Sequence, residues 1–130
     1  MYLLDTNIII FLLKGNETVT AKIQEIGLGK CFISEISVAE LKYGAEKSER
    51  PAFHKKIIAE LLQELTIVPI YNSLDFYAQE KARLAKIGQL IDDFDLLIGS
   101  TAVENNLILV SNNVKHLNRI NTIIIENWLQ

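Results

Sequence analysis

The sequence predicts an α/β fold with a mainly parallel five-stranded sheet flanked by helices. Two observations predict this class. Short apolar segments recur along the chain, and stretches with helical periodicity separate them. Strands that are apolar throughout are typical of parallel sheets whose two faces are both covered by helices. The expected architecture is therefore a three-layer sandwich with the sheet in the middle.

Five segments have the composition of buried strands. Leu107–Val110 is the clearest, because it is apolar at every position, and Thr66–Ile70 is rich in β-branched residues. Pro69 has no backbone N–H to donate, so it places an edge or an end in that strand. The five expected strands are residues 2–4, 30–33, 66–70, 107–110 and 122–125.

The segments between the strands carry helix signals. Glycines at 15, 27 and 88 follow three of them, and Pro51 suits the first turn of another. Asp92 or Asp93 is expected to begin the last long helix. The expected helices are residues 6–13, 18–26, 34–45, 51–65, 74–87 and 92–106, with a turn or short helix at 113–117.

Composition limits the class of protein. The 130 residues suit a single domain over 1–130, and 49% apolar residues suit a packed core. A formal charge of −3 excludes a polycationic nucleic-acid coat. The apolar runs are shorter than the roughly 20 residues that span a bilayer, and the N-terminus lacks a basic region before its apolar stretch. A single cysteine, Cys31, excludes an internal disulfide and a zinc ribbon, so we expect a cytoplasmic protein.

Three acidic residues follow or adjoin the predicted strands. If the first strand is central, Asp5, Glu40 and Asp95 converge at the carboxyl edge of the sheet, where α/β proteins bind their ligands. Carboxylates brought together repel one another unless a cation lies between them. Oxygen ligands without a Cys or His set suit Mg²⁺ or Mn²⁺ rather than zinc, and such ions promote phosphodiester hydrolysis.

Each carboxylate also has a structural interpretation. Asp5 could be only the N-cap of the helix that follows it. Glu40 could be a solvated side chain on a helix. With Asp92 as N-cap, Asp95 falls at the third helical position, where the helix dipole favours an acid. Spacing alone leaves these interpretations open beside the metal site.

Several blocks of sequence resemble the PIN-domain ribonucleases, specifically the VapC-type toxins of toxin–antitoxin pairs. The resemblance covers essentially the whole chain, with the blocks in the family's order. They are Leu3–Asn7, Ile33–Leu41 followed by Gly44, Asp95–Gly99 with Ala102, Leu109–Leu117 and the closing Ile125–Trp128.

The resemblance implies a PIN-like fold and a Mg²⁺-dependent endoribonuclease that is the toxin of a VapBC-type module. It implies that Asp5 and Asp95 hold Mg²⁺, with Mn²⁺ as a substitute, and that Glu40 completes the acidic site directly or through water. Water activated by the metal would attack an RNA phosphate and leave a 5′-phosphate and a 3′-hydroxyl. The implied partners are RNA, a VapB-type antitoxin and a second copy of the chain.

The resemblance also indicates supporting residues. Thr6 and Ser111 would support the carboxylates or the phosphate, and Asn7 would orient Asp5. Many relatives carry a further acid in the fourth block, whereas this chain has Asn113 and His116 at the candidate positions. Asparagine can ligate a hard cation through its carbonyl oxygen but adds no negative charge.

Competing functions make different demands on the sequence. A haloacid-dehalogenase-like phosphatase needs a second Asp two positions after Asp5, where this chain has Asn7. A receiver-like signalling domain needs a phospho-accepting Asp after a middle strand, and Ile33-Ser34 supplies none. A catalytically silent PIN-like domain that binds RNA or protein remains the alternative. Lys115 and Arg119 are further candidates for phosphate contacts.

Overall fold

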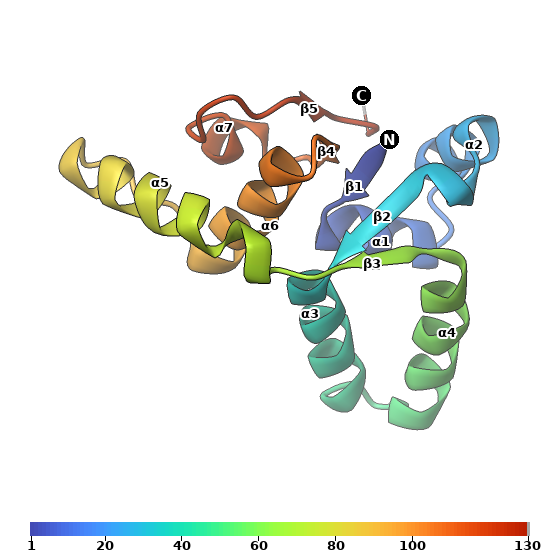
Figure 1. The fold of residues 1–130 in the computed structure, drawn as a ribbon. Coiled ribbons are helices and arrows are strands. Elements are labelled where there is room, and N and C mark those ends of the chain that lie inside the picture. Colours follow the sequence, from blue (N-terminus) through green and yellow to red (C-terminus); the bar gives the residue numbers. More distant parts are fainter. Residues whose placement is uncertain (130) are drawn as a thin grey trace.

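The computed structural model describes residues 1–129, and its centre is a sheet of five parallel strands (Figure 1). The strand order is β3-β2-β1-β4-β5, and each neighbouring pair is parallel. The first strand is therefore central, as the acidic constellation requires. The fold class is confirmed. The strands are Tyr2–Leu4 (β1), Cys31–Ser34 (β2), Thr66–Val68 (β3), Ile108–Val110 (β4) and Ile125–Glu126 (β5).

Helices cover both faces of the sheet, and α3 and α4 project together beyond its edge as an antiparallel pair (Figure 1). No helix among residues 1–129 is both long and apolar enough to cross a membrane. The α-helices are Thr6–Leu13 (α1), Glu17–Ile26 (α2), Glu35–Glu46 (α3), Pro51–Glu64 (α4), Leu74–Lys86 (α5), Asp93–Glu104 (α6) and Val114–Leu117 (α7). Short 3-10 turns lie at Leu28–Lys30 (η1) and Tyr71–Ser73 (η2).

The core has two parts because successive side chains of a strand point to opposite faces. On β1, Leu4 belongs to the cluster formed with α1, α2 and α4, whereas Leu3 belongs to the cluster formed with α5 and α6. On β4, Val110 and Leu109 divide in the same way. Trp128 is buried in the first cluster, with its ring edge-on to Tyr2 at 5.3 Å. The sheet is thus the middle layer, as expected.

The expected fifth strand at residues 122–125 was wrong by about three residues. Thr122 has a φ of 64°, which no strand accommodates. Ile123 packs into the second core cluster, while Ile124 is exposed. Only Ile125 and Glu126 pair with β4. Hydrophobicity alone could not distinguish a turn followed by a strand from one longer strand.

Other boundaries differ by a few residues for local reasons. Ser34 ends β2 and does not begin the next helix, because its side chain is the N-cap that accepts a hydrogen bond from the Ile36 N–H. Strand β3 stops at Val68, immediately before Pro69. Helix α6 stops at Glu104, and Asn106 reverses the chain with a φ of 55°.

A buried ion pair connects α5 to the segment before β5. Glu80 is almost fully buried, and both of its carboxylate oxygens accept hydrogen bonds of 2.8 Å from the Arg83 guanidinium. The same carboxylate accepts from the Asn121 N–H at 2.9 Å, and Arg83 also donates to the Arg119 carbonyl. These hydrogen bonds hold the pKa of the Glu80 carboxyl below its usual range, with the Arg83 contact as the largest cause.

We expect Arg83→Met to lower the free energy of unfolding by about 2 kcal/mol, because a buried carboxylate would lose its charged partner. Urea denaturation at pH 7 measures the change. The control is Lys86→Met on the same helix, whose exposed side chain is expected to contribute little. Equal stability of both variants would show that solvent already screens Glu80.

Candidate active site

The strand order itself marks the place for a site. From β1 the chain passes to β2 and β3 on one side, and β4 and β5 lie on the other. Ligands of open α/β sheets bind at this kind of switch point, outside the carboxyl ends of the strands. Asp5 follows β1 and Ser111 follows β4, so both lie at this point. A cleft of about 690 Å³ opens beside them, with α1, α3 and the start of α6 as its walls.

Asp5 is held rigidly at the bottom of this cleft. Only 5% of the residue is exposed, and its backbone N–H donates to the Val110 carbonyl. One carboxylate oxygen accepts from the Thr6 N–H at 2.8 Å, and the other accepts from the Ser111 hydroxyl at 2.7 Å. Burial raises the pKa of the Asp5 carboxyl, and these two hydrogen bonds oppose that effect. Asp5 is therefore both the N-cap of α1 and a side chain that lines the cleft.

Glu40 reaches the same cleft from α3. The Thr6 hydroxyl lies 2.7 Å from Glu40 Oε1 and 2.8 Å from the Ser37 hydroxyl, so the three groups form one hydrogen-bonded chain. Ser37 is fully buried and lies one turn before Glu40. This set of hydrogen bonds connects α1 to α3 and fixes one carboxylate oxygen of Glu40. The other oxygen of Glu40 accepts no hydrogen bond from the described residues.

Asp95 stands at the first turn of α6, which Asp92 caps by accepting from the Phe94 and Asp95 N–H groups. The Asn113 side-chain amide donates to Asp95 Oδ2 at 3.3 Å. Burial and the nearby charges of Asp5, Asp92 and Glu40 raise the pKa of the Asp95 carboxyl to about 6. Burial thus contributes most to the raised pKa of Asp95, and the charges of the other carboxylates add to it.

The structure brings most of the predicted residues together. Asp5, Thr6, Asn7, Glu40 and Asp95 all line the cleft. Ser111 and Asn113 touch these carboxylates through hydrogen bonds.

Three predicted contacts lie elsewhere. His116 is exposed and contacts Asn113 rather than a carboxylate. Its Nδ1 lies 3.1 Å from the oxygen of the Asn113 amide. Arg119 does not line the cleft, and its guanidinium donates to the Gln89 and Leu90 carbonyls, so its suggested phosphate contact stays a prediction. Lys115 is exposed on α7 and does not line the cleft.

Sequence reasoning did not place four residues of this region at the site. Ser37 completes the chain to Glu40, and its position one turn before that residue was the available signal. Tyr43, Lys47 and Phe94 line the outer part of the cleft. The first two fall on the Glu40 face of α3 at helical spacing, a pattern visible in the sequence only once Glu40 is known to face the cleft.

The donor set suits a hard divalent cation. Asp5 and Asp95 offer oxygen ligands, and their unrelieved repulsion is what a cation would remove. Each Asp5 oxygen accepts one hydrogen bond and keeps a further lone-pair direction. Among residues 1–129, no three His, Cys, Asp or Glu side chains already surround a point where an ion would sit.

A substitution of Asp92 tests which carboxylate near the start of α6 is the candidate metal ligand. Asp92→Ala removes the cap of α6 and is expected to cost about 1 kcal/mol of stability. We expect RNA cleavage to persist in this variant, because Asp92 does not line the cleft. Thermal unfolding and a cleavage assay on the same preparation measure both quantities. Loss of cleavage in a folded Asp92→Ala protein, together with normal cleavage in Asp95→Asn, would show that Asp95 is the wrong ligand.

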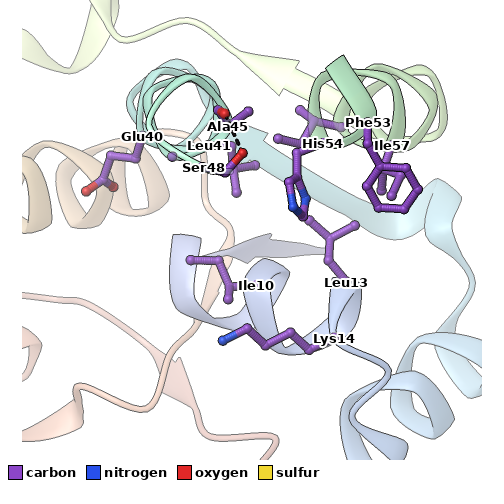
Figure 2. Close-up of a pocket in the computed structure, with 12 residues that line it drawn as sticks. Ile10, Leu13, Lys14, Glu40, Leu41, Ala45, Ser48, Phe53, His54 and Ile57 are labelled. Carbon is purple, nitrogen blue, oxygen red and sulfur yellow. Dashed lines mark hydrogen bonds between the residues drawn. The ribbon is translucent and has the colours of Figure 1, made fainter. Parts of the chain in front are cut away.

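An apolar hollow of about 440 Å³ continues from the cleft between α1, α3 and α4. It shares Ile10, Glu40 and Gly44 with the cleft. Figure 2 shows Glu40 at one end of this hollow and the side chains of Phe53, His54 and Ile57 at the other. The hollow and the cleft thus form one continuous depression that is acidic at the sheet and apolar toward α4.

Comparison with known proteins decides the family. A sequence profile of the PIN domain matches residues 2–122. Ribonuclease VapC2 of Haemophilus influenzae is 39% identical over 129 residues, which is 98% of each chain. This chain belongs to the VapC family of PIN-domain ribonucleases.

Two further relatives agree with this membership. The tRNA(fMet)-specific endonuclease VapC of Shigella flexneri is 30% identical over 128 residues, 98% of this chain and 97% of the relative. The crystal structure of VapBC2 from Rickettsia felis, bound to a DNA fragment from its promoter, contains a chain with 31% identity and a TM-score of 0.90 over 98% of both chains. The VapC fold is therefore preserved along essentially the full length.

Proposed function

We propose that this VapC-family chain is a divalent-metal-dependent endoribonuclease and the toxin of a VapBC-type toxin–antitoxin module. The observation that carries the proposal is the pair of carboxylates at the switch point. Asp5 is fixed between α1 and β4, and its charge helps to raise the pKa of Asp95 to about 6. A folded protein tolerates two neighbouring carboxylates when a bound cation offsets their mutual repulsion.

In this proposal Asp5 and Asp95 hold Mg²⁺, with Mn²⁺ as a substitute, and Glu40 completes the site directly or through water. The cation, when bound, supplies Lewis acidity and charge neutralisation for phosphodiester hydrolysis. Ser111 and the Thr6 N–H orient Asp5, and Asn7 lies beside it at the start of α1. Asn113 positions Asp95 through its amide group. Hydrolysis would leave a 5′-phosphate and a 3′-hydroxyl.

Asn113 takes a positioning role in this proposal rather than that of a ligand. Its N–H₂ group faces Asp95, and its oxygen faces His116 Nδ1. An amide in this orientation holds the Asp95 carboxylate without adding a third negative charge. His116 then orients the amide from the solvent side, and this is the role we propose for it.

The proposed partners are RNA, a VapB-type antitoxin and a second copy of the chain in the cytoplasm. The solved Rickettsia felis neighbour is a VapBC complex, which supports the antitoxin. The apolar hollow in Figure 2 offers a surface for apolar side chains of such a partner. A homodimer is supported by exposed apolar side chains on and just after α5, namely Leu74, Ile87 and Leu90.

The test is cleavage of a panel of structured and unstructured RNAs by the purified chain with Mg²⁺, Mn²⁺ or EDTA. We expect cleavage with either metal and none with EDTA, because the carboxylates alone cannot neutralise the phosphate. Equal cleavage in EDTA would contradict the metal. No cleavage with any metal, by protein shown to be free of a co-purified antitoxin, would favour a silent RNA- or protein-binding PIN domain.

A further inference from the structure

The outer part of the cleft exposes two aromatic side chains. Tyr43 on α3 is 66% exposed and Phe94 at the start of α6 is 47% exposed, although both line the cleft. Leaving large apolar surface in water forgoes the free energy of burial. The two rings come from different walls of the same depression, and Asp95 directly follows Phe94 in the chain.

An acidic, an aromatic and a basic side chain follow one another along the cleft, on one face of α3 and at the residue after its end. Glu40, Tyr43 and Lys47 recur at helical spacing and all line it. Lys47 lies one turn beyond Tyr43, with its ammonium 5.2 Å from the centre of that ring. Lys47 immediately follows the end of α3 and comes seven positions after Glu40, which is about 10 Å along the helix axis. Its ammonium lies against the Tyr43 ring, one turn along the helix from Glu40.

Gly44 lies on the same face, next to Tyr43. A glycine inside a helix costs about 1 kcal/mol relative to alanine. Close packing does not explain this one, because a Cβ atom at Gly44 would meet no neighbour within 4 Å. Its effect is to keep the wall open where the cleft passes into the apolar hollow.

We infer that Tyr43 and Phe94 stack on bases of single-stranded RNA and that Lys47 contacts a phosphate next to the scissile one. This inference rests on the proposed ribonuclease function and adds the residues that position its substrate. An exposed aromatic pair with an adjacent cation is what binding of single strands requires, because every base has a face to stack and every nucleotide a phosphate to neutralise. The bare backbone at Gly44 lets the strand approach α3 closely. Tyr43, Lys47 and Phe94 are called the stacking rim below.

RNA matches the rim better than a protein segment does, because of the charge order along the cleft. The acidic end takes a cation together with the reacting phosphate, and Lys47 takes a phosphate at the other end. The neighbouring hollow, in contrast, is lined mainly by aliphatic side chains and suits a protein. A partner protein that alone uses the rim is one of the outcomes distinguished below.

The first test measures binding without turnover. The Asp5→Asn protein in EDTA is titrated with an unstructured oligoribonucleotide that carries 2-aminopurine, whose fluorescence is quenched by stacking. We expect added Tyr43→Ala or Phe94→Ala to weaken binding about tenfold and to reduce the quenching, since stacking contributes about 1–3 kcal/mol per base. Tyr43→Phe should restore both, because the ring and not the hydroxyl stacks. Lys47→Met should weaken binding and flatten its salt dependence.

Matched controls lie on the same molecule. Tyr71 is an 80% exposed aromatic on η2, and Lys30 is an exposed lysine before the amino end of β2, so neither lines the cleft. Tyr71→Ala and Lys30→Met are expected to bind as the parent does. Rim variants that bind RNA as tightly as these controls would overturn the inference, and loss of antitoxin binding alone would assign the rim to the protein partner instead.

The second test separates this inference from the proposed function. In cleavage assays of otherwise unchanged protein, rim variants are expected to raise KM about tenfold with a smaller change in kcat. If wild type cleaves RNA normally and the rim variants have the same KM as wild type, the role of the stacking rim is refuted and the ribonuclease function stands. Absence of cleavage in wild type would refute the ribonuclease, while the fluorescence titration would still report on the rim.

Discussion

Replacing Asp5 by asparagine is expected to reduce RNA cleavage by at least about a hundredfold, since even outer-sphere changes at metal sites cost about 10- to 100-fold. Asp5 is the carboxylate held most firmly, between the Thr6 N–H and the Ser111 hydroxyl. Asparagine retains an oxygen for the cap and an amide that can donate to Ser111, so the geometry survives while the charge is lost. Multiple-turnover cleavage with Mg²⁺ measures the effect.

The fold should tolerate the Asp5→Asn change. Burial raises the pKa of the Asp5 carboxyl, so its charge is costly in the metal-free protein. We therefore expect a melting temperature equal to or above that of wild type. Asp75→Asn, which alters an exposed carboxylate in the first turn of α5, is the matched control and should leave cleavage unchanged. Normal turnover in Asp5→Asn would rule out Asp5 as a metal ligand.

Asp95→Asn is expected to abolish cleavage and to stabilise the metal-free fold at pH 7. The pKa of the Asp95 carboxyl is raised from its ordinary value of 3.8 to about 6, owing first to burial and then to the charges of Asp5, Asp92 and Glu40. Ionising it in the folded protein is therefore unfavourable. Because the side chain is partly exposed, we expect the gain on substitution to be on the order of 1 kcal/mol.

The pH dependence of this gain has a definite sign. A carboxyl whose pKa is raised by folding favours the folded state while it is protonated, and that contribution is lost as the pH rises through the folded pKa. As the pH is raised from about 4 to about 6 in EDTA, the free energy of unfolding of wild type should thus decrease relative to that of Asp95→Asn. Urea denaturation at several pH values measures the difference. A difference that is constant over this range would mean that Asp95 titrates normally.

Metal should reverse the order of stability. A ligand that binds only the folded state stabilises it in proportion to the logarithm of its concentration. We expect Mg²⁺ to raise the melting temperature of wild type and to have little effect on Asp95→Asn. An equal response of both proteins would place the cation elsewhere.

The parallel sheet was predictable from local sequence patterns, whereas its strand order was not, and the acidic constellation was argued on the condition that the first strand is central. The apolar segment Leu107–Val110 indicates a buried strand, and Asp5 directly follows another such segment. The convergence of Asp5 and Asp95 then follows from parallel topology and the position of α6. The capping of α6 by Asp92, also expected, does not compete with the site, because Asp92 and Asp95 point to different partners.

The features that escaped prediction depend on local backbone conformation or on side-chain direction. The turn at Thr122 needs a positive φ at a β-branched residue, which no propensity indicates. Arg119 follows the fourth block closely, but its guanidinium donates to the carbonyls after α5 instead of facing the cleft. The orientation of the Asn113 amide toward Asp95 is fixed only by its three-dimensional neighbours.

The hydrogen bond between Ser111 and Asp5 joins residues 106 positions apart. During synthesis, Asp5 is made before Asp95, and Asp95 before Ser111. A nascent chain therefore holds an incomplete cleft until residue 111 has left the ribosome. The proposed toxin would become competent to cut RNA only after that point in its own synthesis.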